Sequence, residues 1–240
     1  MKFILASQNK HKVQEFAESI ASIRIQPSPI SIDVEENGSS FLENAAIKAR
    51  AYANALKLNA IADDSGLSVD ALHGAPGIYS ARYAALPPNA DLDPDRDSAN
   101  IRKLLCALAQ TPKESRTAHF TCALCLVIVE KNDLQTLLDT PKLRREAVFY
   151  AANSAADDDA PVPDAPTLTA ENIARAEIAF EAYAYGTILT QRHGTGGFGY
   201  DPIFLSDETQ TTFADLTCAQ KLAVSHRGKA ILRLRDLFDA

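Results

Sequence analysis

Two adjacent carboxylates, Asp63 and Asp64, are the residues of this chain best suited to chemistry. They end the apolar run Ile61–Ala62 and are followed at once by Ser65–Gly66. A strand interior would turn one of two adjacent carboxylates into the core without a partner, so we place the pair at the end of a strand. There both side chains can point into a cleft and hold a divalent cation. Asp-Ser-Gly also favours turns, so a solvated turn is the alternative interpretation.

Glu36 and Glu43 extend this acidic group. Both lie near the expected start of a helix over residues 41–56, and from there they are able to face the Asp63–Asp64 turn. Three or four converging carboxylates repel one another strongly unless a cation lies among them, so this neighbourhood favours magnesium. Ser40 and Glu43 also have the spacing of a capping box, which gives Glu43 a purely structural alternative.

A cationic turn lies near the N-terminus, between an apolar strand over residues 3–6 and a helix over residues 10–20. The turn consists of Ser7, Gln8, Asn9, Lys10, His11 and Lys12. Free backbone N–H groups at a helix start attract anions, and Lys10 and Lys12 add positive charge. Ser7 and Asn9 are equally good helix-capping residues, and the glycines of a P-loop are missing. The turn is therefore an anion site or an ordinary cap.

A glycine-rich loop follows much later in the chain. Residues 194–204 place four glycines around Phe198, Tyr200 and Asp201. Glycines let the backbone close tightly on a ligand, while Phe198 offers a stacking face and Asp201 offers hydrogen-bond acceptors. A tight glycine hairpin with core aromatics is the alternative.

Lys221 and the pair His226–Arg227 form the last polar group. The pair stands at the expected start of a C-terminal helix whose core face is Ile231, Leu234 and Phe238. Cations at this place can bind phosphate or the polar edge of a base. In isolation, a His-Arg pair at a helix start is also ordinary capping or surface charge.

Composition excludes several classes of function. The net charge of −7 argues against the extended basic face of a general nucleic-acid coat, but a small polyanion needs only a local cluster of cations. No apolar run approaches the length of a membrane span, and the first is too short for the core of a signal peptide. We expect a cytoplasmic protein of 240 residues, either one large domain or two lobes, without a membrane or nucleic-acid partner.

Cys122 and Cys125 have the spacing of a metal knuckle. They lie, however, inside a long apolar run over residues 118–129 that reads as a buried strand. Residues three apart on a strand face opposite sides and cannot chelate one ion. We therefore expect both thiols to be structural.

Further elements must position these groups. A short strand running into a turn is expected over residues 32–38, a helix over 98–110 and a half-exposed strand over 177–189. The stretch from residue 131 to about 175 differs, because its centre, 157–166, is small, acidic and rich in proline. This composition predicts a mobile surface insertion.

The polar groups together match the needs of one kind of ligand. A nucleoside triphosphate requires cations for its phosphates, carboxylates for a metal, a ring to stack on, and donors and acceptors for the base edge. Residue types and spacing therefore indicate a hydrolase or binder of nucleotide polyphosphates.

The residues of the individual motifs are more specific than their general chemistry. The motifs are Ser7-x-Asn9-x-x-Lys12, Phe41-x-Glu43-Asn44-Ala45, Ala62-Asp63-Asp64-Ser65-Gly66-Leu67, Gly74-Ala75-Pro76-Gly77-Ile78-Tyr79-Ser80-Ala81-Arg82, Gly194-x-Gly196-Gly197-Phe198-Gly199-Tyr200-Asp201-Pro202 and Ser225-His226-Arg227-Gly228. In this order they resemble the family of non-canonical purine NTP pyrophosphatases, the RdgB-type inosine triphosphate or dITP/XTP pyrophosphatases. The resemblance covers residues 2 to about 130 and 177 to the C-terminus, and the insertion between them is longer than the usual connection of the family.

The resemblance implies a fold and a reaction. The fold is α/β, with a long mixed β-sheet flanked by helices that form two lobes around a central nucleotide cleft, and the protein is a homodimer. The reaction is hydrolysis of ITP, dITP and XTP to the monophosphate and pyrophosphate, with Mg2+.

The same resemblance assigns roles to residues. Glu36 and Asp64 hold the metal, and Asp64 also matches the proton acceptor of the family. The substrate-binding residues are Ser7, Gln8, Asn9, Lys10, His11 and Lys12 for the phosphates, Ser65, then Phe198, Gly199, Tyr200 and Asp201 for the base, and Lys221, His226 and Arg227 for phosphates or base edge.

The chemistry of the base agrees with these roles. A 6-oxo purine shows an acceptor at O6 and a donor at N1, whereas adenine shows the reverse. A cationic donor such as Arg227 or His226, together with an acceptor such as Asp201, reads that edge and leaves adenine with unpaired buried groups. A pyrophosphatase for modified pyrimidine or other triphosphates, and a non-catalytic nucleotide sensor on the same fold, are the alternatives.

Overall fold

The computed structural model describes residues 1–7, 9–17, 23–84, 96–151, 161–162 and 168–239. The chain divides into two compact units. The first unit contains Met1–Asp64, Ala123–Glu181 and Ala230–Ala240, and the second contains Ser65–Cys122 and Ala182–Lys229.

Strands and helices alternate along much of the described chain. The strands are β1 (Lys2–Leu5), β2 (Arg24–Pro27), β3 (Ala60–Val69), β4 (Thr117–Ile128), β5 (Val148–Ala151), β6 (Pro161–Val162), β7 (Ile173–Ile188) and β8 (Phe204–Ser206). The helices are α1 (Lys10–Ala17), α2 (Phe41–Leu56), α3 (Arg96–Ala107), α4 (Lys131–Asp139), α5 (Pro141–Glu146), α6 (Cys218–Val224) and α7 (His226–Phe238), with short 3-10 turns at Asp70–Leu72, Gly77–Arg82, Lys113–Ser115, Asp201–Ile203 and Phe213–Asp215.

One mixed sheet contains the described strands. Its order is β2-β1-β3-β4-β7-β5-β6, and β8 pairs with β7 outside this path. β1 pairs in parallel with both β2 and β3, whereas β5 and β8 pair antiparallel with β7. The predicted α/β fold class with a long mixed sheet is therefore confirmed.

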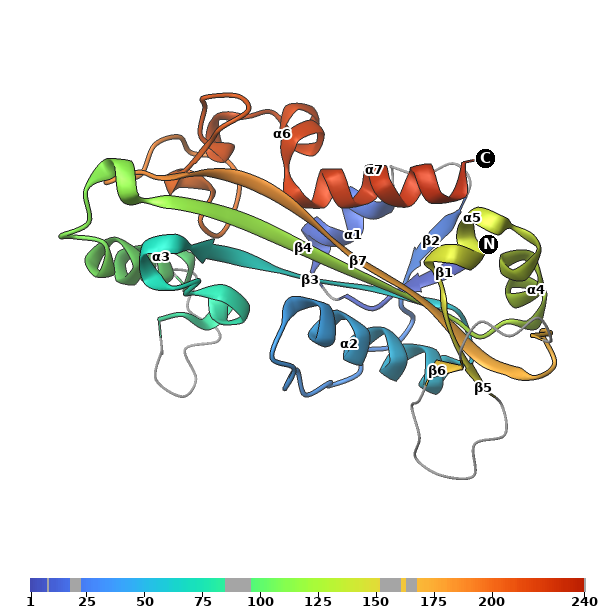
Figure 1. Cartoon of the computed structure of the whole chain (residues 1–240). Coiled ribbons are helices and arrows are strands. Elements are labelled where there is room, and N and C mark those ends of the chain that lie inside the picture. Colours follow the sequence, from blue (N-terminus) through green and yellow to red (C-terminus); the bar gives the residue numbers. More distant parts are fainter. Residues whose placement is uncertain (8, 18–22, 85–95, 152–160, 163–167, 240) are drawn as a thin grey trace. The chain divides into compact units, whose positions relative to one another are not determined.

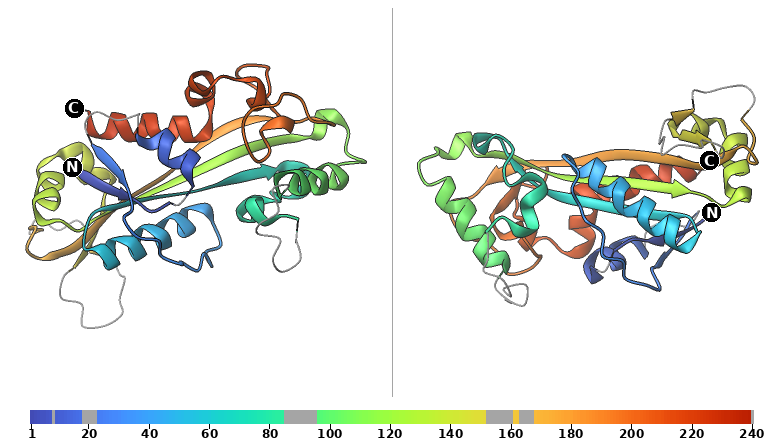
Figure 2. Two further views of the ribbon diagram at one scale, coloured as in Figure 1. Left: turned by 180° about the vertical axis from the view of Figure 1, so that it is seen from behind. Right: turned by 90° about the horizontal axis from the view of Figure 1, so that it is seen from below.

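The first unit is built around the parallel strands β1, β2 and β3. Phe3, Leu5 and Ile61 are buried, as expected where helices cover both faces of a parallel sheet. In Figure 1, α2 lies on one face, and α1 and the C-terminal part of α7 lie on the other. The view from behind in Figure 2 shows the same arrangement. The strand β1 thus places the Ser7 turn directly after a buried strand.

The helix α2 matches the predicted range 41–56. Its stripe Ala45, Ala49 and Tyr52 is buried, because these residues recur at the spacing of one helix face. Ser40 caps the start, and Lys57 ends the helix in the left-handed conformation at φ 55°.

The core of the second unit is aromatic. Phe120 on β4 lies 4.7 Å from Phe204 and 5.8 Å from Phe213, measured between ring centroids. The apolar face of α3 completes this core with Ile101 and Leu104, as its spacing predicted. This core supports the glycine-rich loop, whose Tyr200 belongs to it.

Residues 32–38 do not form the predicted strand. The N–H groups at the two ends of this segment bond to side chains instead: Ile32 N donates to Tyr52 Oη (3.2 Å) and Gly38 N donates to Asn44 Oδ1 (2.8 Å). Side chains of α2 thus hold both ends of the segment in place of a neighbouring strand.

The stretch 131–175 was predicted as a surface insertion, and its two ends are part of the first unit. Leu134, Leu137 and Leu143 of α4 and α5 are buried, and β5 pairs with β7 at Phe149 and Ala176. The prediction of a plain surface excursion is wrong for these ends, because their leucine spacing forms apolar helix faces. Most of the acidic, proline-rich centre lies outside the described residues.

The cysteines agree with the prediction. Cys122 and Cys125 are buried in β4, and both are thiols, as are the exposed Cys106 and Cys218. Among the described helices, none has both the length and the apolar character that crossing a bilayer requires.

Candidate active site

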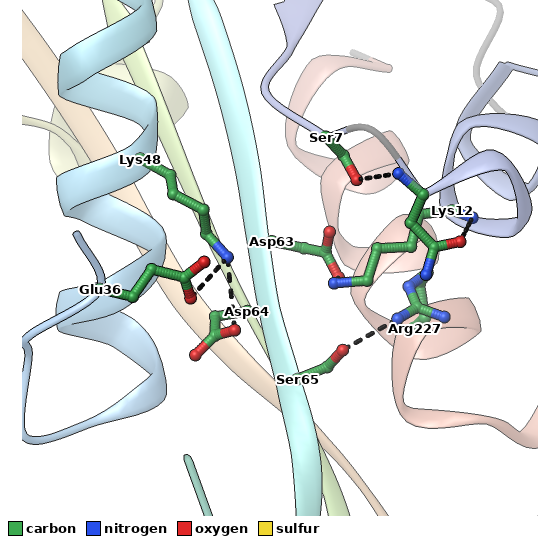
Figure 3. A network of polar contacts seen from close by, with 9 residues as sticks. Ser7, Lys12, Glu36, Lys48, Asp63, Asp64, Ser65 and Arg227 are labelled. Carbon is green, nitrogen blue, oxygen red and sulfur yellow. Dashed lines mark hydrogen bonds and ion pairs between the residues drawn. The ribbon is translucent and has the colours of Figure 1, made fainter. Parts of the chain in front are cut away.

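The two central carboxylates lie in the middle of β3, so both the predicted strand end and the solvated turn are wrong. Alternation along the strand sends Asp63 and Asp64 to opposite faces (Figure 3). Each carboxylate meets a lysine there: Lys12 Nζ lies 2.9 Å from Asp63 Oδ2, and Lys48 Nζ lies 3.3 Å from Asp64 Oδ1. The expected cost of an acid in a strand interior is avoided because each acid is paired.

Asp63 is the structural member of the pair. Its side chain is fully buried, and Lys12 reaches it from α1. The turn before α1 is capped, since Asn9 N donates to Ser7 Oγ (3.2 Å) and Lys12 N donates to Asn9 Oδ1 (3.3 Å). The capping interpretation is confirmed for Asn9, whereas Ser7 bonds the N–H of Asn9 itself, one residue before the helix. Gln8 and the side chains of Lys10 and His11 lie outside the described part of the chain.

Asp64 is the accessible member, and it shares its cation with Glu36. Lys48 Nζ lies 3.1 Å from Glu36 Oε2, so one ammonium bridges two carboxylates (Figure 3). Burial raises the pKa of Asp64; Lys48 and Lys12 act against this rise, and Glu36 and Asp63 add to it. Burial alone would lower the pKa of Lys48, but the surrounding carboxylates outweigh it and raise that pKa. Asp64 is thus a carboxylate that holds a proton more readily than an ordinary aspartate.

Lys48 is the residue of this group that the sequence analysis missed. It lies on α2 three residues after Ala45 and four before Tyr52, both of which are buried. A lysine on the apolar stripe of a helix is a signal that it reaches a buried acid, and this spacing was visible in the sequence.

Glu43 closes the helix start and does not join the carboxylate group. Ser40 Oγ accepts from Glu43 N (3.2 Å), and Glu43 Oε2 accepts from Ser39 N (2.6 Å) and Ser39 Oγ (2.8 Å). These bonds from Ser39 lower the pKa of Glu43. The capping role is confirmed, with the difference that the return bond goes to Ser39 and not to Ser40 as in a standard capping box.

The donor set of this group suits magnesium in the presence of a phosphate ligand. No cluster of three or more potential metal ligands occurs among the described residues. Glu36 and Asp64 nevertheless converge on one point, which the Lys48 ammonium occupies. Mg2+ is typically held by one or two carboxylates together with waters and substrate phosphates, so two converging carboxylates are sufficient.

In the second unit, Arg227 is held beside the continuation of β3. Arg227 Nη2 donates to Ser65 Oγ at 2.9 Å, and the arginine is 2% exposed. The neighbouring His226 stacks on Phe120, with ring centroids 4.8 Å apart and planes 11° apart. Gly228 N donates to Ser225 Oγ, so Ser225 supplies a bond to the start of α7. The alternative of surface charge is wrong for His226 and Arg227, because both are buried.

The glycine-rich loop is organised by one carboxylate. Asp201 Oδ2 accepts from Phe198 N (2.9 Å) and pairs with Lys221 Nζ (2.5 Å), which also lies 4.4 Å from the centre of the Phe198 ring. At Gly197, which has φ +74°, an added Cβ would come within 2.3 Å of Asp201 Oδ2. Lys221 is thus a cation that lies beside both Asp201 and the Phe198 ring.

Two residues of this loop serve the scaffold. Tyr200 is buried and donates from its hydroxyl to Ser80 O (2.9 Å), and burial raises the pKa of this hydroxyl. Its side chain is a core group, as the hairpin alternative predicted for the aromatics. Gly199 N donates to the Asp97 carboxylate at 2.6 Å, so this glycine is held by α3.

Known proteins resemble this chain over its full length. Residues 3–140 and 165–237 match the model of the Ham1 family. A dITP/XTP pyrophosphatase of Desulforamulus reducens is 36% identical over 244 residues, which covers 100% of this chain and 96% of that protein. Another, of Thioalkalivibrio sulfidiphilus, is 40% identical over 235 residues, covering 96% of this chain and 95% of that protein.

Solved structures agree. The Staphylococcus aureus Ham1 protein has a TM-score of 0.70 at 33% identity, with 100% of this chain and 98% of that chain covered. The nucleoside-triphosphatase/dITP/XTP pyrophosphatase of Mycobacterium abscessus has a TM-score of 0.62 at 32% identity, with 98% of each chain covered.

Proposed function

The chain belongs to the Ham1 family, and we propose that it hydrolyses non-canonical purine nucleoside triphosphates, namely ITP, dITP and XTP, to the monophosphate and pyrophosphate. One observation carries this function: relatives named dITP/XTP pyrophosphatases are 36–40% identical to the chain over nearly its whole length. The enzyme is a nucleoside triphosphate pyrophosphatase.

Asp64 accepts the proton of the attacking water. Water attacks the α-phosphorus, so a new P–O bond forms, the α–β anhydride bond breaks, and pyrophosphate leaves with the electron pair. A general base must be deprotonated near neutral pH and still have a real affinity for a proton. The raised pKa of Asp64, together with its partial exposure, supports this assignment.

The remaining groups of the first unit bind charge. Glu36 and Asp64 hold Mg2+ when it is bound with the substrate, and the ion supplies neutralisation of the phosphate charge. Lys48, which bridges Glu36 and Asp64, and Lys12, which pairs with the neighbouring Asp63, contact phosphate oxygens. The Ser7–Lys12 turn offers backbone N–H groups of the α1 start to the same anion.

The second unit reads the base. Phe198 provides the stacking face, with Lys221 and Asp201 as donor and acceptor beside it. Arg227 donates to the acceptor O6 of a 6-oxo purine, and Ser65 orients Arg227. Adenine places a donor where a 6-oxo purine has the acceptor O6. The Arg227 donor is then left without an acceptor, which weakens the binding of adenine.

The test is pyrophosphate release from ITP, XTP, GTP, ATP and dTTP, with Mg2+ and with EDTA. Strong, metal-dependent release from ITP and XTP alone is the expected result. Preference for GTP, ATP or dTTP would overturn the base assignment. Nucleotide binding without release from any of them would make the protein a nucleotide sensor.

We also propose that the protein is a cytoplasmic homodimer. This proposal is supported by the family resemblance alone. Light scattering of the purified protein at several concentrations tests it, and a mass of one chain, near 25.9 kDa, at every concentration would overturn it.

A further inference from the structure

The loop that carries Phe198 adopts a conformation that requires support. Gly197 and Gly199 have φ values of +74° and +59°, so the chain reverses sharply on both sides of Phe198. Glycine pays a large entropic cost for being held in one conformation, so such a turn is well defined only when its backbone groups are bonded. Two successive N–H groups of this turn are bonded to carboxylates.

The first of these carboxylates belongs to the loop, and the second does not. Phe198 N donates to Asp201 Oδ2 at 2.9 Å, three residues further on. Gly199 N donates to Asp97 Oδ2 at 2.6 Å, and Asp97 lies 102 residues earlier, in the first turn of α3. A charge-assisted bond of this length is among the stronger hydrogen bonds that proteins form.

The helix α3, which carries the exposed Asp97, is tied to its surroundings one turn further on, at Asn100. Asn100, one turn further along α3, is 3% exposed. Its Oδ1 accepts from Ala84 N (2.7 Å) and its Nδ2 donates to Ala81 O (3.2 Å). Ala81 belongs to the 3-10 turn Gly77–Arg82. Ser80 of the same turn accepts from the Tyr200 hydroxyl with its carbonyl oxygen.

We propose that Asp97 is a positioning residue for base recognition: by holding Gly199 it fixes the Phe198 ring beside Lys221 in the arrangement that accepts the purine. This inference rests on the proposed function, because it assigns base stacking to Phe198. Asp97 acts through the backbone and touches no reacting atom. Loss of its carboxylate leaves Gly199 N without this partner, and the loop then samples conformations in which the stacking face is misplaced.

A purely structural role for Asp97 gives different expectations. An aspartate in the first turn of a helix also stabilises the helix through its charge. Asp97→Asn removes that charge but keeps an oxygen that accepts from Gly199 N. If Asp97 served only the helix, Asp97→Asn and Asp97→Ala would behave alike.

The experiment compares Asp97→Ala, Asp97→Asn and the matched control Ser98→Ala. Ser98 is the next residue of α3, and its Oγ accepts from Arg192 Nη1 at 2.7 Å, a bond outside the 197–201 turn. For each variant, kcat and KM are measured with ITP, XTP and GTP. Hydrogen exchange of the Gly199 amide is measured by NMR on the protein without nucleotide.

In Asp97→Ala, we expect KM for ITP and XTP to rise about tenfold with little change in kcat, which is the size of effect of one lost hydrogen bond to a charged group. The preference for XTP over GTP falls, and the Gly199 amide exchanges faster. In Asp97→Asn, KM and the exchange rate of the Gly199 amide stay close to the wild-type values. Ser98→Ala behaves like the wild type.

Unchanged KM in Asp97→Ala, equal defects in Asp97→Ala and Asp97→Asn, or the same defect in Ser98→Ala would each overturn the inference. A wild-type enzyme without preference for ITP and XTP would overturn the proposed function instead. In that case the Gly199 exchange rates still report whether Asp97 holds the turn, so the two failures are distinguishable.

Discussion

The two faces of β3 use the same residue type for opposite purposes. Asp63 is fully buried and paired with one lysine, whereas Asp64, the next residue, keeps 15% of its side chain exposed and shares Lys48 with Glu36. A fully buried ion pair must stay intact, because removing one partner leaves a desolvated charge. A partly exposed carboxylate can exchange its partner for a metal, a proton or a substrate. Burial, and not residue type, separates the structural acid from the chemical one.

The same contrast distinguishes the polar groups of the two units. In the first unit, Glu36 and Asp64 are held by ion pairs to Lys48 and keep contact with solvent. In the second unit Asp201, His226 and Arg227 are almost completely buried and are held by the Lys221 ion pair, hydrogen bonds and stacking. Chemistry on a phosphate needs water and a metal ion, whereas discrimination between bases needs donors and acceptors in fixed positions.

Asp64→Asn should abolish turnover and leave nucleotide binding largely intact. The amide cannot accept the proton of the attacking water, and general-base catalysis contributes about 100-fold to 10,000-fold in rate. Pyrophosphate release from ITP and nucleotide binding by calorimetry measure the two effects. Asp33→Asn is the matched control, since Asp33 is an exposed acid near Glu36. Full activity in Asp64→Asn would show that Asp64 is not the general base, and the two faces of β3 would no longer differ in chemical role.

Asp63→Asn should affect stability before activity. It leaves the Lys12 ammonium without its buried partner, and we expect the free energy of unfolding to fall by about 3 kcal/mol. Urea unfolding measures this change. The double variant with Lys12→Met should recover part of the loss, because no unpaired charge remains. A single variant as stable as the wild type would show that the buried pair is not needed.

Gly197→Ala and Gly199→Ala separate strain from crowding in the loop of the second unit. Both positions have positive φ, which costs about 1 kcal/mol for alanine. Only at Gly197 does the new Cβ also collide with the Asp201 carboxylate, whereas a Cβ added at Gly199 meets no heavy atom within 4 Å beyond its chain neighbours. Gly197→Ala should therefore lose about 2–3 kcal/mol of stability and raise KM for XTP, with a smaller effect in Gly199→Ala. Thermal unfolding and KM values check both; equal effects would contradict the predicted collision.

Lys48→Met should shift the pH dependence of the reaction. Burial raises the pKa of Asp64, and the Lys48 ammonium acts against this rise. Removing the ammonium raises the pKa further, and because Asp64 works in its deprotonated form, the acidic limb of kcat/KM moves to higher pH. Lys2→Met, an exposed lysine of β1, is the control. An acidic limb that stays in place or moves to lower pH would show that Lys48 does not lower the pKa of Asp64.

Much of the fold was predictable because it follows from local periodicity. The stripe Ala45, Ala49 and Tyr52 predicts α2, and the apolar run around Cys122 predicts β4, whatever the rest of the chain does. The strand predicted over residues 32–38 failed for the complementary reason. Its alternation is genuine, but strand formation depends on a neighbouring strand, and this segment is held at its two ends by side chains of α2 instead.

The sequence alone determined which chemical groups the protein possesses: the carboxylates Glu36 and Asp64, the glycine-rich loop and the cations near the C-terminus. Only the tertiary structure decided their partners. Lys48, 16 residues from Asp64, and Asp97, 102 residues from Gly199, reach their partners through the packing of helices. The free-energy cost of burying an acid inside a strand depends on whether the element packed against it carries a cation. The residues next to the acid in the sequence carry no information about that element.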